Sequence, residues 1–327
     1  MSTTALTRRS TLVFGLLAAA AVLAAIFGSV AGSADLSARQ IVAALLGPGD
    51  ELAHSIVWQL RMPRVLAGFA VGALLSLAGV LLQTMLRNPL ADPYVLGLSG
   101  GGAIGALAAM SLGAGLLVTQ GCAAVGALLA LILVVALGER GSNARLLLTG
   151  AVVASACGAL LTVLLTIADA PQLRGMVFWL AGDLGWAPEP AWALALALAA
   201  TVTCMLCGRG LNLLASGDLR AASLGLAVPL WRRCILLGSA ILTAFAVVTA
   251  GAIGFVGLIV PHGARLALGS ADHRVLVPAA AIAGGSLLVV ADALARTVAA
   301  PRQLPVGAVM ALIGAPIFVV LLRRAAR

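Results

Sequence analysis

Arg61-Met-Pro-Arg64 opens the stretch that decides the fold, and Asn88-Pro-Leu-Ala-Asp-Pro-Tyr-Val-Leu-Gly-Leu-Ser-Gly-Gly-Gly102 closes it. The apolar run of residues 65–82 between them is long enough to cross a bilayer. The prolines of the second motif stop this span and turn the chain straight back toward the lipid. An arginine pair at one face and a Pro-broken, Gly-rich turn at the other indicate a membrane protein that conducts a substrate.

The composition excludes a soluble fold. Hydrophobic residues make up 62% of the 327 positions and charged residues 9%, whereas a soluble domain carries roughly a quarter charged residues. Lipid must therefore surround most of the chain. The net charge of +9 comes from arginines scattered singly at the ends of apolar runs, which argues against nucleic-acid binding. Because the chain contains no lysine, it has no Walker A loop, and another subunit must hydrolyse any ATP it uses.

The apolar runs predict an all-α integral membrane protein with about ten transmembrane helices in a single domain, residues 1–327. With the N-terminus inside, fourteen of the twenty arginines fall on the cytoplasmic side, as the positive-inside rule requires. An even number of spans, with both termini cytoplasmic, preserves this bias. The predicted spans are residues 12–31, 62–82, 94–112, 116–137, 146–167, 190–207, 233–250, 252–268, 275–297 and 305–322.

The N-terminal run has a second interpretation, because Thr7-Arg-Arg-Ser10 and the apolar residues after it are similar to a secretory signal. The run is about as long as a full span and further spans follow, so we predict an uncleaved first helix. Two outer segments are long enough to hold structure. Residues 35–60 include a predicted amphipathic surface helix at 41–46, and residues 168–190 predict either a re-entrant helix near a pathway mouth or an ordinary loop helix.

Glycines and prolines mark close helix contacts and a broken helix. Gly100-Gly-Gly-Ala-Ile-Gly105 fits the dinucleotide pattern literally, but it lacks the preceding strand and the later acidic residue. Small residues at this spacing instead let membrane helices approach or unwind. In residues 251–265 three glycines precede Pro261, as expected of a broken helix beside a pathway. His262 has no ligand partner in that segment, and Cys204-Met-Leu-Cys207 has no second pair, so we predict no metal site.

The longest polar stretch on the inner side is Ser216-Gly-Asp-Leu-Arg-Ala-Ala-Ser-Leu-Gly225. Ser216 is expected to cap a short helix, Asp218 to lie in its first turn, and Gly225 to end it. Such a helix outside the membrane is either a connector or a docking helix for a cytoplasmic partner, and we favour docking.

Asp292 and Arg296 are spaced i, i+4 on one helix face, in the favourable order. An arginine at mid-bilayer costs about 2.5–3.5 kcal/mol on insertion scales, so Arg296 is expected near the outer end of its span. Asp292 is the one acid well inside any predicted span, whereas a proton-driven transporter would show several. An ion-gradient-driven secondary transporter is nevertheless the main alternative to an ATP-driven one. A non-transporting scaffold is a further alternative, which the Gly-broken spans disfavour.

Taken together, these motifs resemble the FecCD-type permease subunits of bacterial ABC importers for iron–siderophores, haem and cobalamin. The resemblance covers essentially the whole chain, with its motifs in order. These motifs are Arg61-Met-Pro-Arg64, Asn88-Pro-Leu-Ala-Asp-Pro93, Gly97-Leu-Ser-Gly100, Leu211 to Gly225, Gly254-Phe-Val-Gly-Leu258 with Pro261-His262, Asp292 to Arg296, and Leu304-Pro-Val-Gly307 with Gly314-Ala-Pro316.

The resemblance implies a type II ABC importer permease fold that works as a homodimer in the bacterial inner membrane. The implied partners are two cytoplasmic ABC ATPase subunits, which would carry ATP and Mg, and a periplasmic or extracellular substrate-binding protein. The chain itself is expected to be no enzyme, to bind no cofactor and no nucleic acid, and to lie in the lipid bilayer. An iron–siderophore complex is the expected cargo, followed by cobalamin and haem.

The resemblance also assigns residues, and the topology above already places the first group outside. That group, expected to dock the binding protein, is Arg61, Arg64 and Arg296. The ATPase-coupling helix, at about residues 211–228, is implied at Ser216, Gly217, Asp218, Leu219, Arg220, Ala222, Leu224 and Gly225. The pathway and its hinges, between the two copies and along the fifth and tenth spans, are implied at Gly97, Ser99, Gly100, Thr149, Ser155, Thr162, Thr166, Gly254, Gly257 and Pro261.

Overall fold

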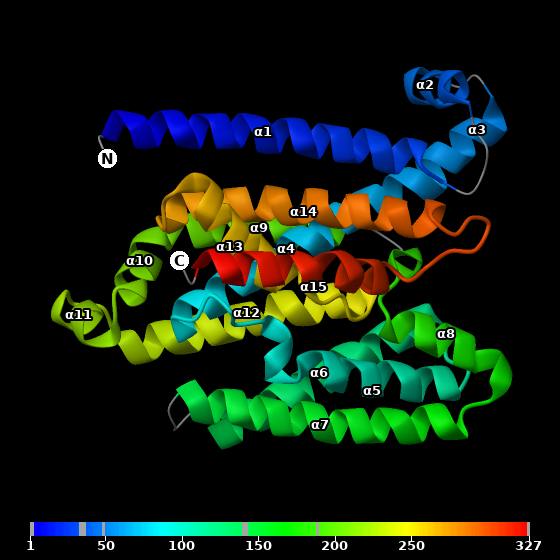
Figure 1. Ribbon diagram of the computed structural model, residues 1–327. Coiled ribbons are helices and arrows are strands. Elements are labelled where there is room, and N and C mark those ends of the chain that lie inside the picture. The colour runs from blue at the N-terminus through cyan, green and yellow to red at the C-terminus, as the bar shows by residue number, and fades with distance from the viewer. Residues whose placement is uncertain (1–2, 33–36, 48–49, 139–142, 188–189, 326–327) are drawn as a thin grey trace.

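The computed structural model describes residues 3–32, 37–47, 50–138, 143–187 and 190–325, and every regular element in these ranges is a helix. Figure 1 shows long helices that run side by side in one bundle. The long helices are α1 (Thr3–Val30), α4 (Met62–Leu86), α6 (Leu116–Gly138), α7 (Asn143–Ile167), α9 (Pro190–Leu206), α12 (Val228–Ala250), α14 (His273–Thr297) and α15 (Val306–Ala325). The shorter elements are α2 (Ala38–Leu46), α3 (Glu51–Ser55), the π-helical turn η1 (Ile56–Arg61), η2 (Pro93–Leu96), α5 (Leu98–Ser111), α8 (Ala170–Leu180), η3 (Leu184–Trp186), α10 (Gly208–Ala215), α11 (Asp218–Ser223) and α13 (Val256–Leu268).

Each predicted span coincides with a helix of the structure. Six helices of the described residues are long and apolar enough to cross a membrane, and α9 with α10, bent by 63°, forms a seventh candidate. The shorter apolar helices α5 and α13 and the apolar segment Val306–Leu321 of α15 occupy the three remaining predicted spans. Ten crossings and cytoplasmic termini therefore remain predictions.

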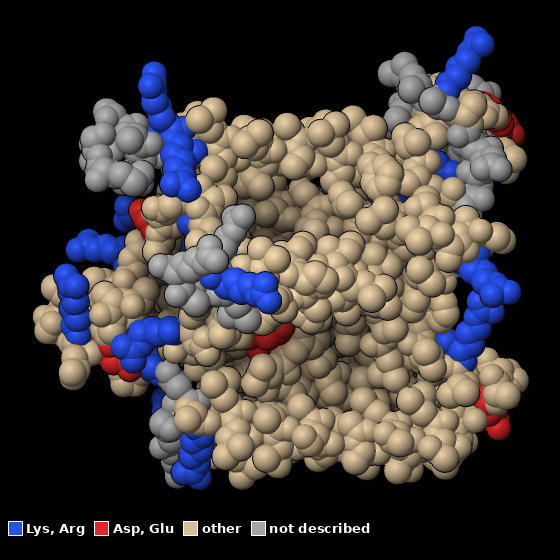
Figure 2. All heavy atoms as spheres, viewed as in Figure 1, with Lys and Arg blue, Asp and Glu red and all other residues tan. Residues whose placement is uncertain are grey.

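The two ends of the bundle differ in what they hold. The described chain ends, Thr3 and Ala325, lie at the same end as α10 and α11, which we call the inner end (Figure 1). The outer end, opposite, holds α2, α3 and α8. Charged side chains gather mainly at these two ends, and the flank between them is mostly uncharged (Figure 2). This distribution suits a chain whose flank faces lipid.

Helix α4 forms the centre of the bundle. Nearly all of its residues from Val65 to Leu86 are buried, and it packs against α14, α12, α9 and α13. The apolar helix already begins at Glu51, eleven residues before the predicted start at residue 62. The widened turn η1 ends two residues before Pro63, whose ring would clash with the carbonyl four residues earlier in a regular helix. The chain therefore passes Pro63 without a break.

The amphipathic helix predicted at 41–46 is confirmed as α2, which begins at Ala38 behind a capping box of Ser37 and Gln40. Its buried residues Ile41 and Ala44 pack with Ala53 of α3.

The elbow after α4 forms as the sequence predicts. Asn88 Oδ1 accepts a hydrogen bond from the Leu90 amide at 2.9 Å, and Asp92 Oδ1 accepts one from the Tyr94 amide at 2.9 Å. Burial raises the pKa of the Asp92 carboxyl, and the hydrogen bond from Tyr94 opposes that rise. The Tyr94 hydroxyl in turn accepts a hydrogen bond from the Ile253 amide at 2.8 Å, so it joins the elbow to the chain before α13.

The predicted broken helix at residues 251–265 is also confirmed. Helix α12 ends at Ala250, where Gly251 follows with a φ of 70°, and α13 begins at Val256 after five residues outside any helix. Phe255 adopts a positive φ of 70° at the start of α13, an uncommon conformation for a residue with a side chain.

Small residues let α4 approach its neighbours closely. A Cβ atom at Gly72 would collide with the backbone of Gly284 in α14, and one at Gly79 would collide with the backbone of Gly257 in α13. In the same way, Gly101 of the predicted glycine motif faces Gly126 of α6, so that motif serves helix packing. Lipid tails are as apolar as leucine, so such close packing has to hold the helices together.

We expect Gly79→Ala to destabilise the protein, because the methyl group has to displace the backbone of Gly257 rather than a flexible side chain. Overpacking of this kind costs about 1–3 kcal/mol. The midpoint of thermal unfolding of detergent-purified protein should fall. Gly15→Ala in α1 is the matched control, because no atom lies within 4 Å of its added Cβ. Equal midpoints for the two variants would contradict the close contact between α4 and α13.

Candidate functional site

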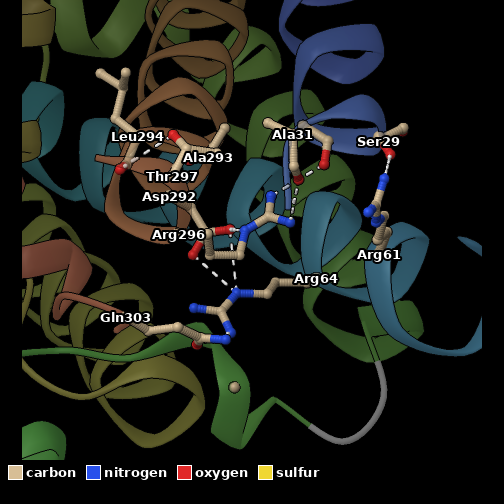
Figure 3. Close-up of polar contacts among 12 residues, drawn as sticks. Ser29, Ala31, Arg61, Arg64, Asp292, Ala293, Leu294, Arg296, Thr297 and Gln303 are labelled. Carbon is tan, nitrogen blue, oxygen red and sulfur yellow. Dashed lines mark hydrogen bonds and ion pairs between the residues drawn. The ribbon is translucent and has the colours of Figure 1, made fainter. Parts of the chain in front are cut away.

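At the outer end, the carboxylate of Asp292 binds two arginines from different helices (Figure 3). Arg64 Nε of α4 lies 2.9 Å from Asp292 Oδ1, and Arg296 Nε of α14 lies 2.9 Å from Asp292 Oδ2. Asp292 is 2% exposed, so its charge needs partners of this kind. The expectation that Asp292 is paired is confirmed, and Arg296 lies one residue before the end of α14.

Two arginines of the outer end, Arg61 and Arg296, bind the last carbonyls of α1. Arg61 Nη1 donates to the carbonyls of Ser29 and Val30 at 3.0 and 2.8 Å, and Arg296 donates to those of Gly28 and Ala31 at 3.0 and 2.8 Å. These carbonyls have no partner within the helix, and the end of a helix dipole favours positive charge. Both guanidinium groups therefore complete the fold of α1.

Arg64 extends the cluster to the chain after α8. Its Nη2 atom lies 3.0 Å from Asp183 Oδ1, and its Nη1 atom lies 3.5 Å from Gln303 Oε1. Asp183 also accepts the Gly185 amide at 2.9 Å. We name this set, which has three arginines, two aspartates and a net charge of +1, the outer ion cluster; its members are Arg61, Arg64, Asp183, Asp292 and Arg296.

The predicted topology placed Arg61, Arg64 and Arg296 outside, and the family resemblance assigned them to docking. The structure brings all three together, with Arg61 4% and Arg296 5% exposed. Their contact with a partner protein stays a prediction, and Arg64 is the most accessible of the three. Sequence reasoning missed Asp183, because it lies in a loop more than one hundred residues from Asp292 with no local motif to mark it.

At the inner end, the predicted docking helix exists as α11, and it is separated from α10 by Gly217 with a φ of 113°. The prediction that Ser216 caps this helix is wrong. Ser216 ends α10 instead, where its hydroxyl donates to the Leu213 carbonyl at 2.7 Å, because the break comes one residue later at Gly217. Asp218 lies in the first turn of α11 as predicted, and Gly225 follows with a φ of 85°.

Helix α11 presents an apolar side chain to solvent beside a basic pocket. Leu219 is 90% exposed, and α10 and α11 project beyond their neighbours (Figure 1). Asp218 is held by Arg232 of α12 at 3.1 Å, which fixes α11 to the start of that helix. The pocket beside α11 has a volume of about 490 Å³ and is lined by Arg209, Asn212, Leu213, Ser216, Arg220, Leu224 and Arg274.

A buried chain of hydrogen bonds leads from α10 into the bundle. Asn212 Nδ2 donates to Asp272 Oδ1 at 2.7 Å, and Asn212 Oδ1 lies 2.6 Å from His273 Nδ1. An amide oxygen only accepts, so His273 Nδ1 carries the proton. His273 Nε2 lies 2.7 Å from the Thr84 hydroxyl of α4. This series of hydrogen bonds thus links α10, α14 and α4, and no sequence motif predicted it.

Asp272 stays charged in this arrangement. Burial acts to raise its pKa, but the hydrogen bonds from the Asn212 side chain and the Arg274 amide, together with the charge of Arg274, outweigh that effect and lower the pKa.

The predicted pathway residues fall into two groups. In the first, Gly97 and Gly100 pack against α7, near Val153 and Cys157. The hydroxyls of Ser155, Thr162 and Thr166 lie on exposed faces of α7, where each donates to the carbonyl four residues earlier. The residues of this group are Gly97, Ser99, Gly100, Thr149, Ser155, Thr162 and Thr166.

The second group is Gly254, Gly257 and Pro261, at the start of α13. The Gly257 carbonyl accepts a hydrogen bond from Gln83 Nε2 of α4 at 3.2 Å. Through its hydrogen bond to Ile253, Tyr94 connects the segment before α5 with the segment before α13. Whether these residues line a pathway stays a prediction. In the part of the chain that the structure describes, no group of three metal-ligating side chains comes together.

We expect Asp292→Asn to destabilise the fold, because it leaves two largely buried guanidinium groups without their counter-charge. Removing one partner of a buried ion pair costs about 3–5 kcal/mol. The yield of monodisperse protein and its unfolding midpoint should both fall, and Asp169→Asn, at an exposed carboxylate, is the control. The double variant Asp292→Asn with Arg64→Gln should lose less unfolding free energy than the sum of the losses in the two single variants. Additive effects would show that the two side chains are not coupled.

Comparison with known proteins agrees with this architecture. The FecCD transport family matches residues 17–324. The vitamin B12 import system permease proteins BtuC of Escherichia coli O139:H28 and O8 are each 39% identical to it over 290 residues, which cover 86% of this chain and 89% of theirs. A solved structure described as a metal-chelate type ABC transporter in an inward-facing conformation superposes with a TM-score of 0.84 at 30% identity, covering 96% of this chain and 99% of that one.

PsaBC from Streptococcus pneumoniae, solved in complex with a Fab, shares the fold at a TM-score of 0.57 and 14% identity, over 83% of this chain and 94% of that one. The match over nearly the whole sequence and the shared architecture lead to one conclusion: this chain belongs to the FecCD transport family.

Proposed function

We propose that this chain is the permease subunit of an ATP-driven importer that moves a large metal chelate across the inner membrane of a bacterium. The permease works as a homodimer with two cytoplasmic ATPase subunits, which carry ATP and Mg, and with a substrate-binding protein at the outer end. The observation that carries this proposal is the match over most of the chain to relatives described as vitamin B12 import permeases. The ATPase chemistry belongs to the partner, because this chain has no lysine for a nucleotide-binding loop.

The inner end supports coupling to an ATPase. Leu219 offers a large apolar contact on a helix that projects beyond the bundle. A displacement of α11 would be transmitted to α12 directly through the Asp218–Arg232 ion pair. Through α10, it would also be transmitted to the central helix α4 by way of Asn212, His273 and Thr84. ATP binding would thus tilt the bundle and alternate the access of the pathway.

The pathway would lie between the two copies, along the exposed faces of α7 and α15. The hydroxyls of Ser155, Thr162 and Thr166 on α7 each donate to a carbonyl of their own helix, so the face that they share is only weakly polar. Such a surface tolerates a bulky cargo rather than selecting it. The binding protein would then choose the chelate. The names of the relatives favour cobalamin over the iron–siderophore complex that the sequence first suggested.

An ion-gradient-driven transporter would need a carboxylate that binds the transported proton, and this geometry removes Asp292 as the candidate. Both oxygens of Asp292 accept hydrogen bonds from arginines, so this carboxylate offers no open position for a transported proton.

Uptake into proteoliposomes that contain the full complex tests the proposed function. We expect cobalamin or a ferric chelate to accumulate only with ATP on the ATPase side and with the binding protein outside. Collapse of the proton and sodium gradients by ionophores should leave uptake unchanged. Uptake that follows the gradient in the absence of ATP would reject the proposal, and competition between unlabelled cobalamin and ferric siderophores identifies the cargo.

We expect Leu219→Asp to abolish copurification of the ATPase subunit while the permease still folds. Burying a leucine contributes about 1.5–3 kcal/mol, which corresponds to roughly a 10- to 100-fold change in affinity. Leu112→Asp is the matched control, because Leu112 is 86% exposed and follows α5, far from α11. If Leu219→Asp retains the ATPase as well as the wild type does, α11 is a connector rather than a docking helix.

A further inference from the structure

The basic pocket beside α11 brings together three arginines from three helices. Arg209 belongs to α10, Arg220 to α11 and Arg274 to α14, and all three side chains are exposed. Among the described residues, no acid lines the pocket and no ion pair involves any of these arginines. Three positive charges around one pocket of about 490 Å³ indicate an anionic ligand.

Two contacts hold the pocket in shape. The stem of Arg274 packs on α10, since a Cβ atom at Gly208 would lie 2.7 Å from Arg274 Cγ. Asp272 Oδ1 accepts hydrogen bonds from the Asn212 side chain at 2.7 Å and from the Arg274 amide at 3.0 Å, which fixes the start of α14 beside α10. Even with the charge of Asp272 included, three arginines and one aspartate give the site a net charge of +2.

The pocket lies at the inner boundary of two predicted membrane spans. Arg209 follows the span 190–207 by two residues, and Arg274 precedes the span 275–297 by one residue. At the ends of a span, long basic side chains extend their charged groups to the depth of the lipid headgroups. Two of the three guanidinium groups are therefore expected at the level of the lipid phosphates of the inner leaflet.

An exposed apolar face of α9 leads toward the pocket. Leu198, Val202 and Leu206 are exposed and follow one another at intervals of four residues, so they share one side of the helix. Arg209 comes three residues after Leu206, just beyond the 63° bend between α9 and α10. An acyl chain that covers this face would place its headgroup beside Arg209.

We propose that the pocket binds the phosphate headgroup of one anionic phospholipid of the inner leaflet. This inference rests on the proposed function only in placing the inner end on the cytoplasmic side of the membrane. A phosphodiester accepts several N–H donors at once, and the planar forks of Arg209, Arg220 and Arg274 match it. Basic pockets between membrane helices on the cytoplasmic side bind anionic headgroups in the same way.

A lipid fits this pocket better than the ATPase subunit does. Arg220 and Leu224, four residues apart, lie on the side of α11 that lines the pocket. Leu219 does not line it, and it lies on another side of α11, because successive residues of a helix are rotated by about 100°. The proposed ATPase contact and the basic pocket thus occupy different faces of α11, and both can be filled at the same time.

Native mass spectrometry of the purified full-length permease tests the proposal, with dioleoyl phosphatidylglycerol as the anionic probe and dioleoyl phosphatidylcholine as the zwitterionic one. We expect each protomer to retain one phosphatidylglycerol and to bind phosphatidylcholine roughly tenfold more weakly. Each of the variants Arg209→Gln, Arg220→Gln and Arg274→Gln should weaken phosphatidylglycerol binding roughly fivefold, the effect of one basic residue near an anionic lipid surface. The triple variant should bind the two lipids equally.

Arg8→Gln is the matched control, because Arg8 is an exposed arginine at the same end of the bundle but outside the pocket. Its phosphatidylglycerol binding should equal that of the wild type, and every variant should stay monodisperse. An equal loss in Arg8→Gln and in the pocket variants would show that anionic lipids gather around the inner end without a site, and would overturn the inference.

Two competition experiments identify the source of the phosphate. Excess inorganic phosphate or glycerophosphate should leave the lipid bound, because neither has an acyl chain to lie along α9. Displacement by either would assign the pocket to a soluble anion. The complete complex with the ATPase should retain phosphatidylglycerol as well as the permease alone does, and loss of the lipid on ATPase binding would assign the pocket to that partner. Either of these losses would overturn the inference.

The inference and the proposed function fail by different results. Leu219→Asp, which should release the ATPase, should still retain phosphatidylglycerol. Equal retention of the two lipids by the wild type would reject the lipid site, while ATP-driven uptake would still support the proposed function. Selective lipid binding by a complex whose uptake follows an ion gradient would instead reject the proposed function and leave the lipid site standing.

Discussion

The carboxylate of Asp292 is the constraint on which the outer half of the structure depends. Helices in lipid gain little from burying apolar surface against one another, because the lipid is equally apolar. Polar bonds and close backbone contacts must therefore set their positions. Asp292 holds Arg64 of α4 and Arg296 of α14, and Arg296 in turn binds the last carbonyls of α1. Without that carboxylate, Arg296 would lose the partner that holds it against the end of α1. Helix α1 would then keep Arg61 at its outer end and, at its inner end, the bonds from Arg9 to the carbonyls of Leu266 and Ala267.

Helix α4 takes part in three successive layers of contact between the two ends. Arg64 enters the outer ion cluster, Gly72 and Gly79 bring neighbouring backbones close in the middle, and Thr84 joins the hydrogen-bond chain to α10. The rigid middle and the specific ends make α4 suited to carry a displacement of the inner end to the outer one. A packed core of this kind shifts between discrete arrangements rather than deforming continuously.

The sequence predicted the spans because lipid demands long apolar runs, and it predicted the elbow because Asn88 and Asp92 satisfy backbone donors within a few residues. It placed the start of this span at residue 62, because charges and prolines were read as the ends of apolar runs, whereas the π-helical turn before Pro63 lets the helix continue. It missed Asp183, Asn212 and His273, whose partners lie far away along the chain. Local sequence patterns predict local geometry, whereas pairs of residues that lie far apart in the sequence are seen only in the tertiary structure.

The same limit explains why arginines at span ends cannot be sorted by sequence. Arg296 and Arg302 lie six residues apart at the outer end, yet the first is enclosed by helix carbonyls and the second stands in an open pocket. A guanidinium group that completes a helix end cannot leave it for a partner without exposing unsatisfied carbonyls in a region short of water. Position in the sequence alone therefore does not show which arginine at a span end completes a helix and which stands in the open.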